Sequence, residues 1–220
     1  MSGYDIAIDG PAGAGKSTIA KKIAAKKNMI YVDTGAMYRA MALYMLREKV
    51  DLSDTAAIAE KCESAQITIK YRDGVQCVFL NGENVNGLIR TEEVSEAASK
   101  TSVVPEVRKK LVSLQQEMAI TESVVMDGRD IGTKVLPNAR LKIFLTASVA
   151  VRARRRFDEL ISRGESAFLT EIEEEIRERD RRDTTRKESP LVQADDAVLV
   201  DTSKMTIDEV VDKILSLVDW

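Results

Sequence analysis

The sequence contains no histidine. This excludes Ser-His-Asp triads, histidine metal sites and histidine general bases, so any chemistry here needs no imidazole. Cysteine is scarce: Cys62 and Cys77 form no C-x-x-C pair, and we interpret both as packing residues, as in a reducing cytoplasm. No apolar run approaches the roughly 20 residues of a membrane span, and the N-terminus enters a strand pattern without a signal segment. We therefore expect a cytoplasmic protein.

Strong charge of one sign is also missing. The chain has 220 residues and a net charge of −3, with 44% hydrophobic and 31% charged residues, which is an ordinary composition for a soluble protein. This length suits one α/β domain with elaborations. The weak negative charge argues against a general nucleic-acid binder, and we expect neither nucleic acid nor membrane as a partner.

The most informative segment is Gly10-Pro11-Ala12-Gly13-Ala14-Gly15-Lys16-Ser17, which fits G-x-x-x-x-G-K-[ST]. It follows a predicted strand at 4–9 and precedes a predicted helix at 17–27, which is the context that a phosphate-binding loop requires. Lys16 would reach the β- and γ-phosphates of a nucleoside triphosphate, and Ser17 would ligate Mg²⁺. The alternative is a glycine-rich turn without function. The predicted triphosphate-binding residues are Gly10, Pro11, Ala12, Gly13, Ala14, Gly15, Lys16, Ser17 and Thr18.

Strands alternate with helices along the chain, which predicts an α/β fold with a parallel sheet between two helical layers. The five predicted central strands are 4–9, 30–33, 123–127, 140–145 and 197–201. The helices between and after them are predicted at 17–27, 35–47, 54–64, 92–100 and 105–121, in a charged helical region over 148–183, and after a capping box that begins at Thr206. Alternating runs at 66–71 and 75–80 flank Asp73-Gly74 and predict a hairpin, with a further turn at Asn81-Gly82. We expect this block to be an insertion packed at one edge.

Ligands of open parallel sheets gather at the carboxyl ends of the strands, where this sequence places arginines and carboxylates. Asp127 closes an apolar strand and suits the carboxylate that holds hydrated Mg²⁺, although an aspartate at this position also suits a plain turn. Ten arginines lie between residues 152 and 186. We assign about half of them to a solvated helix face paired with nearby glutamates, and the others to phosphate groups, which planar guanidinium groups bind well.

The absence of histidine favours a phosphate group as the acceptor in phosphoryl transfer. A hydroxyl acceptor needs a base, whereas a phosphate is already ionised at pH 7 and needs only positioning and charge neutralisation. Asp33 remains an alternative base.

Four segments together resemble the bacterial cytidylate kinases over essentially the whole chain. They are 10–18, Asp33-Thr34-Gly35-Ala36-Met37-Tyr38-Arg39, Asp127-Gly128-Arg129-Asp130-Ile131-Gly132-Thr133 and Arg179-Asp180-Arg181-Arg182-Asp183-Thr184-Thr185-Arg186. The resemblance implies a P-loop kinase fold and transfer of the ATP γ-phosphoryl group to CMP or dCMP, with Mg²⁺. It implies one domain over 1–220: a core of 1–34, 122–147 and 184–220, a monophosphate-binding region with the insert at about 35–121, and a helical lid at about 148–166. We expect a monomer.

The resemblance also implies a set of site residues. The monophosphate site would comprise Thr34, Arg39, Ser99, Arg108, Arg129, Asp130, Arg179, Asp183 and Arg186. Arg39 and Arg129 would hold the phosphate, Arg108, Asp130 and Arg186 would read cytosine, and Arg179 and Asp183 would bind the sugar. Catalysis would fall to Lys16, Arg129, Arg152 and Arg155, with Arg154 and Arg156 as further lid candidates, and Mg²⁺ to Ser17 and to Asp127 through water. A carboxylate at Asp130 suits cytosine independently, because cytosine presents an amino donor where uracil presents a carbonyl.

Two rival functions remain open from the residues alone. One is another small-molecule kinase on the same fold, acting on a hydroxyl, on UMP or on AMP. The other is a GTP-dependent switch or a nucleic-acid-stimulated ATPase, but the chain has no Asn/Thr-Lys-x-Asp guanine reader, and Gly128 follows Asp127 where a motor usually has a second acidic residue.

Overall fold

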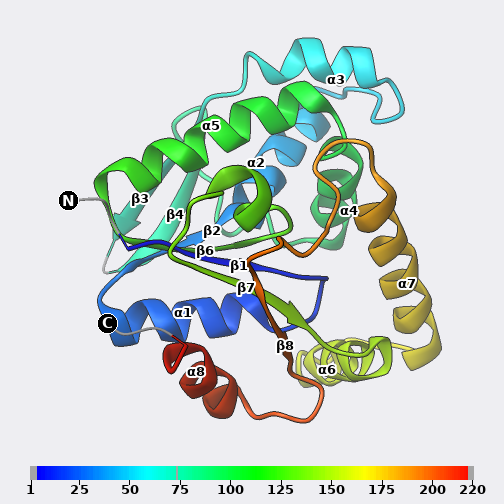
Figure 1. Cartoon of the computed structure of the whole chain (residues 1–220). Helices are drawn as coiled ribbons and strands as arrows, with labels where there is room; N and C mark the ends of the chain where they lie inside the picture. The colour runs from blue at the N-terminus through cyan, green and yellow to red at the C-terminus, as the bar shows by residue number, and fades with distance from the viewer. Residues whose placement is uncertain (1–3, 73, 218–220) are drawn as a thin grey trace.

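A computed structural model describes residues 4–72 and 74–217 and shows a central parallel sheet with the strand order β2-β6-β1-β7-β8 (Figure 1). Its strands are β1 (Ile6–Asp9), β2 (Ile30–Asp33), β6 (Val124–Gly128), β7 (Leu141–Thr146) and β8 (Val198–Asp201). The prediction of five parallel strands is confirmed. Helices cover both faces of the sheet, so the central strand β1 is buried throughout, and its residues before Asp9 are all apolar.

Successive side chains of β1 enter two different cores. Ile6 and Ile8 pack with α1 (Lys16–Lys27) and α8 (Ile207–Leu215) on one face. Ala7 packs on the other face, near α5 (Pro105–Thr121) and a single π-helical turn at Ile131–Val135. Helix α8 begins with the predicted capping box, in which Thr206 and Glu209 exchange hydrogen bonds. The π-helical turn was not predicted.

The segment between β2 and β6 forms a region with its own core. Its elements are α2 (Thr34–Arg47), α3 (Thr55–Cys62), β3 (Ile67–Arg72), β4 (Val75–Leu80), β5 (Glu83–Asn84), α4 (Glu92–Thr101) and α5. Strands β3, β4 and β5 form a separate antiparallel sheet, which confirms the predicted hairpin and small sheet. Met37, Met41 and Met45 of α2 are buried in this core, and both cysteines are buried and unpaired.

The hairpin lies against β2, the edge strand of the central sheet, as expected for an insertion (Figure 1). Side chains rather than strand pairing make the connection. The amide group of Gln76 accepts from the backbone N–H of Asp33 at 2.8 Å and donates to its carbonyl at 3.1 Å. The Tyr71 hydroxyl donates to the carbonyl of Tyr31 at 3.1 Å. The insert therefore supports the carboxyl end of β2.

The predicted charged region forms two helices, α6 (Val149–Ser162) and α7 (Leu169–Thr185), rather than a continuous one. The chain turns between them at Gly164, whose φ of +77° favours glycine. The two helices pack together through Ala153, Ile172 and Ile176. Within residues 4–72 and 74–217, no helix is both long enough and apolar enough to cross a bilayer.

Candidate active site at the carboxyl ends of the strands

The phosphate loop joins β1 to α1, as the sequence predicts. Gly10 has φ +146°, and a Cβ atom there would lie 1.9 Å from the Leu145 carbonyl oxygen of β7, so only glycine fits. Gly15 has φ +91° and caps α1. The Lys16 ammonium is buried and donates to the Pro11 carbonyl at 2.7 Å. Burial, together with the neighbouring Arg129, lowers the pKa of Lys16 well below its usual range.

Asp127 ends the neighbouring strand β6 and faces the loop. Its Oδ2 accepts from the Ser17 hydroxyl at 2.9 Å, and its Oδ1 accepts from the Tyr31 hydroxyl at 2.7 Å. The Thr34 hydroxyl donates to its carbonyl oxygen at 2.7 Å. Burial raises the pKa of the Asp127 carboxyl, and Asp33 adds to this effect. Ser17 and Asp127, which the sequence predicts as metal residues, therefore lie together, whereas Tyr31 was missed because its pattern is that of an ordinary strand.

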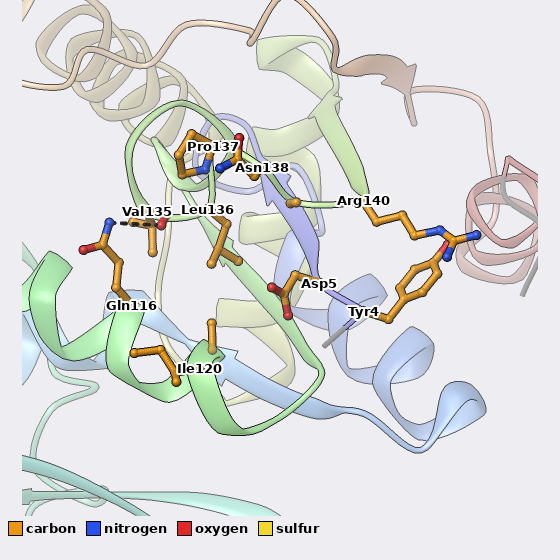
Figure 2. A pocket seen from close by; sticks show the side chains of 11 residues that line it. Tyr4, Asp5, Gln116, Ile120, Val135, Leu136, Pro137, Asn138 and Arg140 are labelled. Atoms are coloured by element: carbon orange, nitrogen blue, oxygen red, sulfur yellow. Dashed lines mark hydrogen bonds between the residues drawn. The ribbon is translucent and has the colours of Figure 1, made fainter. Parts of the chain in front are cut away.

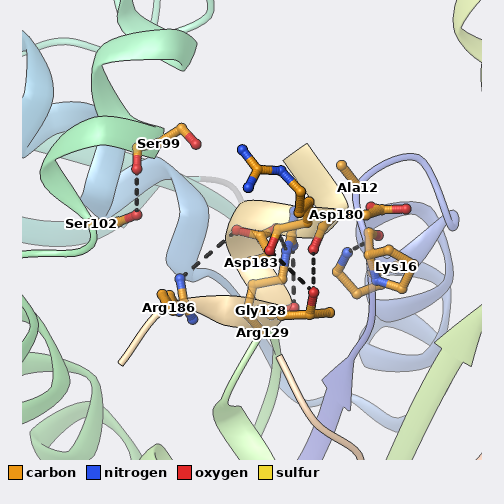
Figure 3. A network of polar contacts seen from close by, with 12 residues as sticks. Ala12, Lys16, Ser99, Ser102, Gly128, Arg129, Asp180, Asp183 and Arg186 are labelled. Carbon is orange, nitrogen blue, oxygen red and sulfur yellow. Dashed lines mark hydrogen bonds and ion pairs between the residues drawn. The ribbon is translucent and has the colours of Figure 1, made fainter. Parts of the chain in front are cut away.

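The arginines predicted to bind the monophosphate are paired with carboxylates. Arg39 Nη2 lies 3.1 Å from Asp33 Oδ2, and Arg129 Nε donates to Asp183 Oδ2 at 2.8 Å. Figure 3 shows Asp183 between Arg129 and Arg186, with Lys16 beyond Arg129. Burial would raise the pKa of Asp183, but the nearby guanidinium groups, Arg129 first, outweigh it and lower that pKa.

Arg108 and Asp130 form the most buried of the site's ion pairs, with about 6% of each side chain exposed. Arg108 Nη1 also donates to the Ser102 carbonyl at 3.1 Å. In the same part of the site, Arg186 Nε donates to the Ser189 carbonyl at 2.7 Å. Ser99 lies in α4, and its carbonyl oxygen accepts from the Ser102 hydroxyl at 3.1 Å (Figure 3).

Arg179 differs from the other site arginines because none of the carboxylates described in the structure forms an ion pair with it, whereas Arg39, Arg108, Arg129 and Arg186 each face an aspartate. Its Nε is buried without a hydrogen-bond acceptor among the residues described, as are those of Arg39 and Arg108. Burial, reinforced by the charge of Arg129, lowers the pKa of Arg179 to about 10. Its charge also lowers the pKa of Lys16, so Arg179 lies near the phosphate-loop lysine.

The lid arginines are not equivalent. Arg152 is buried; its guanidinium donates to the Ala12 carbonyl of the phosphate loop at 3.1 Å and forms a two-pronged pair with Asp180 at 3.0 and 2.6 Å. Arg155 instead turns to Thr202, whose carbonyl and hydroxyl it contacts at 2.9 and 3.2 Å. Arg154 and Arg156 are exposed and pair with acidic residues of their own helix. The structure brings only Arg152 of these four against the phosphate loop.

Asp9 is a second residue that the sequence did not single out. Its carboxylate is buried and accepts from the backbone N–H groups of Ile131 and Gly132, at 2.8 and 2.7 Å. Burial raises the pKa of Asp9 to about 6, although these two hydrogen bonds act in the opposite direction. Asp9 thereby fixes the segment that follows Arg129 and Asp130 onto the start of the phosphate loop.

A separate cavity of about 520 Å³ lies at the opposite end of the strands, beside the amino ends of β1 and β7. It is lined by the start of β1, the end of α5 and the loop before β7, including Asp5, Gln116, Ile120 and Leu136 (Figure 2). No predicted site residue lines it, so the candidate active site is the cluster around Lys16 and Arg129.

A parallel sheet of this order, with the phosphate loop after its central strand and arginines facing Lys16, defines a P-loop kinase. A gluconokinase from Sinorhizobium meliloti has a similar fold, with a TM-score of 0.50, 16% identity and coverage of 98% of this chain and 90% of that one. An uncharacterised protein from Eubacterium ventriosum gives a TM-score of 0.52 at 14% identity over 97% and 96% of the two chains.

Sequence comparison is more specific. The family model described as cytidylate kinase matches residues 6–219. The cytidylate kinase of Caldicellulosiruptor bescii is 50% identical over 99% of this chain and 96% of its own length, and that of Desulforamulus reducens is 52% identical over 97% and 96%. The chain belongs to the cytidylate kinase family and is a nucleoside monophosphate kinase.

Proposed function

We propose that this chain transfers the γ-phosphoryl group of ATP to CMP or dCMP in a direct, Mg²⁺-assisted step that yields CDP or dCDP. Family membership supports this activity. The observation that carries the proposal is the convergence of Arg129 and Asp183, from two distant segments, in front of the phosphate-loop lysine. A phosphate acceptor held there faces the γ-phosphate without needing a base, in keeping with a chain that lacks histidine.

The phosphate loop would hold ATP, with Lys16 at the β- and γ-phosphates. The site also suits Mg²⁺, because Ser17 and Asp127 offer one hydroxyl and one carboxylate at the loop. In the described part of the chain, no group of three or more acidic or cysteine side chains is arranged to bind a metal alone. Mg²⁺ commonly binds through one or two carboxylates, substrate phosphates and water, so this sparse set is sufficient. When bound, the ion would neutralise charge on the transferring phosphoryl group.

The monophosphate would bind by exchanging partners with the paired arginines. Arg39 and Arg129, now opposite Asp33 and Asp183, would turn to its phosphate. Each of these two guanidinium groups is oriented and compensated by a carboxylate, so neither is an isolated charge. We keep Arg108, Asp130 and Arg186 as the residues that read cytosine, and Thr34 and Ser99 as further residues of the monophosphate site.

For Arg179 we propose a phosphate contact in place of the sugar contact that the resemblance implies. It is buried beside other cations and has a free Nε, and its pKa of about 10 leaves it charged at neutral pH. A buried cation of this kind is strongly favoured to meet an anion. We propose the transferred phosphoryl group as that anion and leave the sugar to Asp183. Arg152 would support the loop, and a phosphate contact of Arg155 requires a change from its present hydrogen bonds to Thr202.

An acceptor screen tests the function. With Mg²⁺ and ATP, formation of ADP should be fast with CMP and dCMP, and slow with UMP, AMP and shikimate. The Lys16→Ala variant serves as the control for contaminating kinases. Preferential turnover of AMP, or of shikimate as a hydroxyl acceptor, would overturn the proposal. Light scattering in solution tests the accompanying expectation of a monomer, and transfer to CMP should need neither nucleic acid nor membranes.

A further inference from the structure

The Asp127 carboxylate is held from both sides by hydroxyl groups. Ser17 donates to Oδ2 at 2.9 Å and Tyr31 donates to Oδ1 at 2.7 Å. About 6% of Asp127 is exposed, so little water is available to replace either donor. The two donors nevertheless differ in position, because Ser17 belongs to the phosphate loop itself, whereas Tyr31 reaches in from β2.

Tyr31 is itself fixed by its surroundings. Its backbone pairs with β6, where it lies opposite Val125. The hydroxyl of Tyr71 donates to its carbonyl oxygen at 3.1 Å, and the Lys21 ammonium lies 5.5 Å from the centre of its ring. A phenol held at its ring and at its backbone is a rigid donor, in contrast to a mobile serine hydroxyl.

The two donors would have different tasks when the metal binds. As a ligand of Mg²⁺, Ser17 would turn a lone pair of its hydroxyl oxygen to the ion, so its O–H would follow the position of the metal. Oδ2 of Asp127 would also accept from water on the metal, while the bond from Tyr31 to Oδ1 would stay and keep the carboxylate in its plane. Groups that orient a metal-bound carboxylate typically change metal affinity by about 10–100-fold when removed.

We propose that Tyr31 is a positioning residue for the metal centre, which holds the Asp127 carboxylate toward Mg²⁺ in the complex with nucleotide. This inference rests on the proposed role of Asp127. In this arrangement Tyr31 would touch neither substrate nor metal and would act by orienting that carboxylate. Its removal should therefore weaken the contribution of Mg²⁺ to nucleotide binding and leave metal-free nucleotide binding and CMP binding unchanged.

The test measures affinity for an imido analogue of ATP by calorimetry, once with Mg²⁺ and once with EDTA. The ratio of the two affinities is the metal enhancement. In Tyr31→Phe this ratio should fall about tenfold. The matched control is Tyr71→Phe, which also removes one tyrosine hydroxyl, here the donor to the Tyr31 carbonyl. The pairing of β2 with β6 still holds the Tyr31 backbone in that variant, so the ratio should stay unchanged. Mn²⁺ affinity of the ADP complex, followed by electron paramagnetic resonance, should fall in parallel.

Asp127→Asn separates this inference from the function on which it rests. If Asp127→Asn keeps the wild-type enhancement, the proposed metal role of Asp127 is wrong. If Asp127→Asn loses the metal enhancement and Tyr31→Phe keeps it, the role of Asp127 stands and the positioning role of Tyr31 is wrong. On the Asp127→Asn background, adding Tyr31→Phe should change the ratio by less than about twofold, and an equal loss on both backgrounds would show that Tyr31 acts elsewhere. Tyr31→Leu, which is smaller and also lacks a donor, replaces Tyr31→Phe if that variant does not fold.

Discussion

Asp130→Asn should narrow the preference for CMP over UMP. In the structure, Asp130 accepts a hydrogen bond from Arg108 through Oδ2, and Oδ1 has no hydrogen-bond partner among the residues described. That free oxygen suits the amino group of cytosine and repels the carbonyl that uracil places there. The substitution keeps the shape of the side chain, removes its charge and allows an amide N–H to face uracil.

The expected size follows from the burial of the pair. A hydrogen bond to a charged group contributes about 1.5–3 kcal/mol, so kcat/KM for CMP should fall about 10–150-fold. The kcat/KM for UMP should stay the same or rise, because the repulsion between the Asp130 carboxylate and the uracil carbonyl disappears. The ratio of the two should therefore narrow by about tenfold or more. Removing one partner of a buried ion pair destabilises a protein by about 3–5 kcal/mol, and retention of an amide at this position reduces that loss.

Steady-state kinetics with CMP and UMP on the same preparation is the assay, with thermal melting to confirm folding. Asp183→Asn is the matched control, since it also removes a carboxylate that is paired with an arginine, but at the proposed sugar contact. Asp183→Asn should lower kcat/KM for CMP and for UMP by a similar factor. If Asp130→Asn also lowers kcat/KM for CMP and for UMP equally, Asp130 only orients Arg108 and does not contact the base.

Further predictions concern the phosphate groups and Asp9. Lys16→Ala should lower kcat about 10²–10³-fold with little change in KM for CMP, and near-normal kcat in a folded variant would contradict the phosphate-loop assignment. Arg39→Met and Arg129→Met should each lower kcat/KM for CMP about 10–150-fold and leave ATP affinity, measured by calorimetry, nearly unchanged. If ATP affinity falls and the kinetics with CMP do not change, the two arginines bind the phosphates of ATP and not that of CMP. The raised pKa of Asp9, about 6 against 3.8, means that its stabilising contribution is present below pH 4 and is lost as pH rises through 6. When unfolding is measured with urea, the free energy of unfolding of Asp9→Asn relative to that of wild type should therefore rise by about 3 kcal/mol between pH 4 and pH 7.5. A change of the opposite sign would show that the hydrogen bonds from Ile131 and Gly132 outweigh burial.

The sequence predicts the sheet and the insert well because their signals are local. An apolar run such as 4–9 needs cover on both faces, and Asp73-Gly74 between alternating runs specifies a hairpin. The break between α6 and α7 escaped prediction because charged residues continue through it, and Gly164 alone is a weak signal. The first two residues of the π-helical turn donate their backbone N–H groups to the distant Asp9 carboxylate, so no local sequence pattern predicts the turn.

The residues of the candidate site also divide into those that the sequence predicts and those that it does not. Motif spacing predicts that Lys16, Ser17 and Asp127 meet, and the structure brings them together. Spacing alone does not rank the lid arginines: Arg152 and Arg155 are three residues apart in one helix, yet their guanidinium groups reach different loops. Tyr31 remained unpredicted because an aromatic residue in a strand usually serves packing, and its hydroxyl partner lies 96 positions away.

The separate core of the insert has a mechanical consequence. Its buried residues, from Ala36 to Leu111, form a cluster distinct from the two clusters beside the central sheet, but α5 belongs to both parts, because Leu111 lies in the cluster whereas Val112 and Met118 pack against the sheet. The amide group of Gln76, hydrogen-bonded to the backbone of Asp33, adds a second connection at the end of β2. Arg39 and Arg108 belong to the insert, whereas Arg129 and Asp130 follow from the end of β6. A monophosphate bound as proposed would therefore contact both parts with its phosphate and with its base, and would hold the insert against the central sheet.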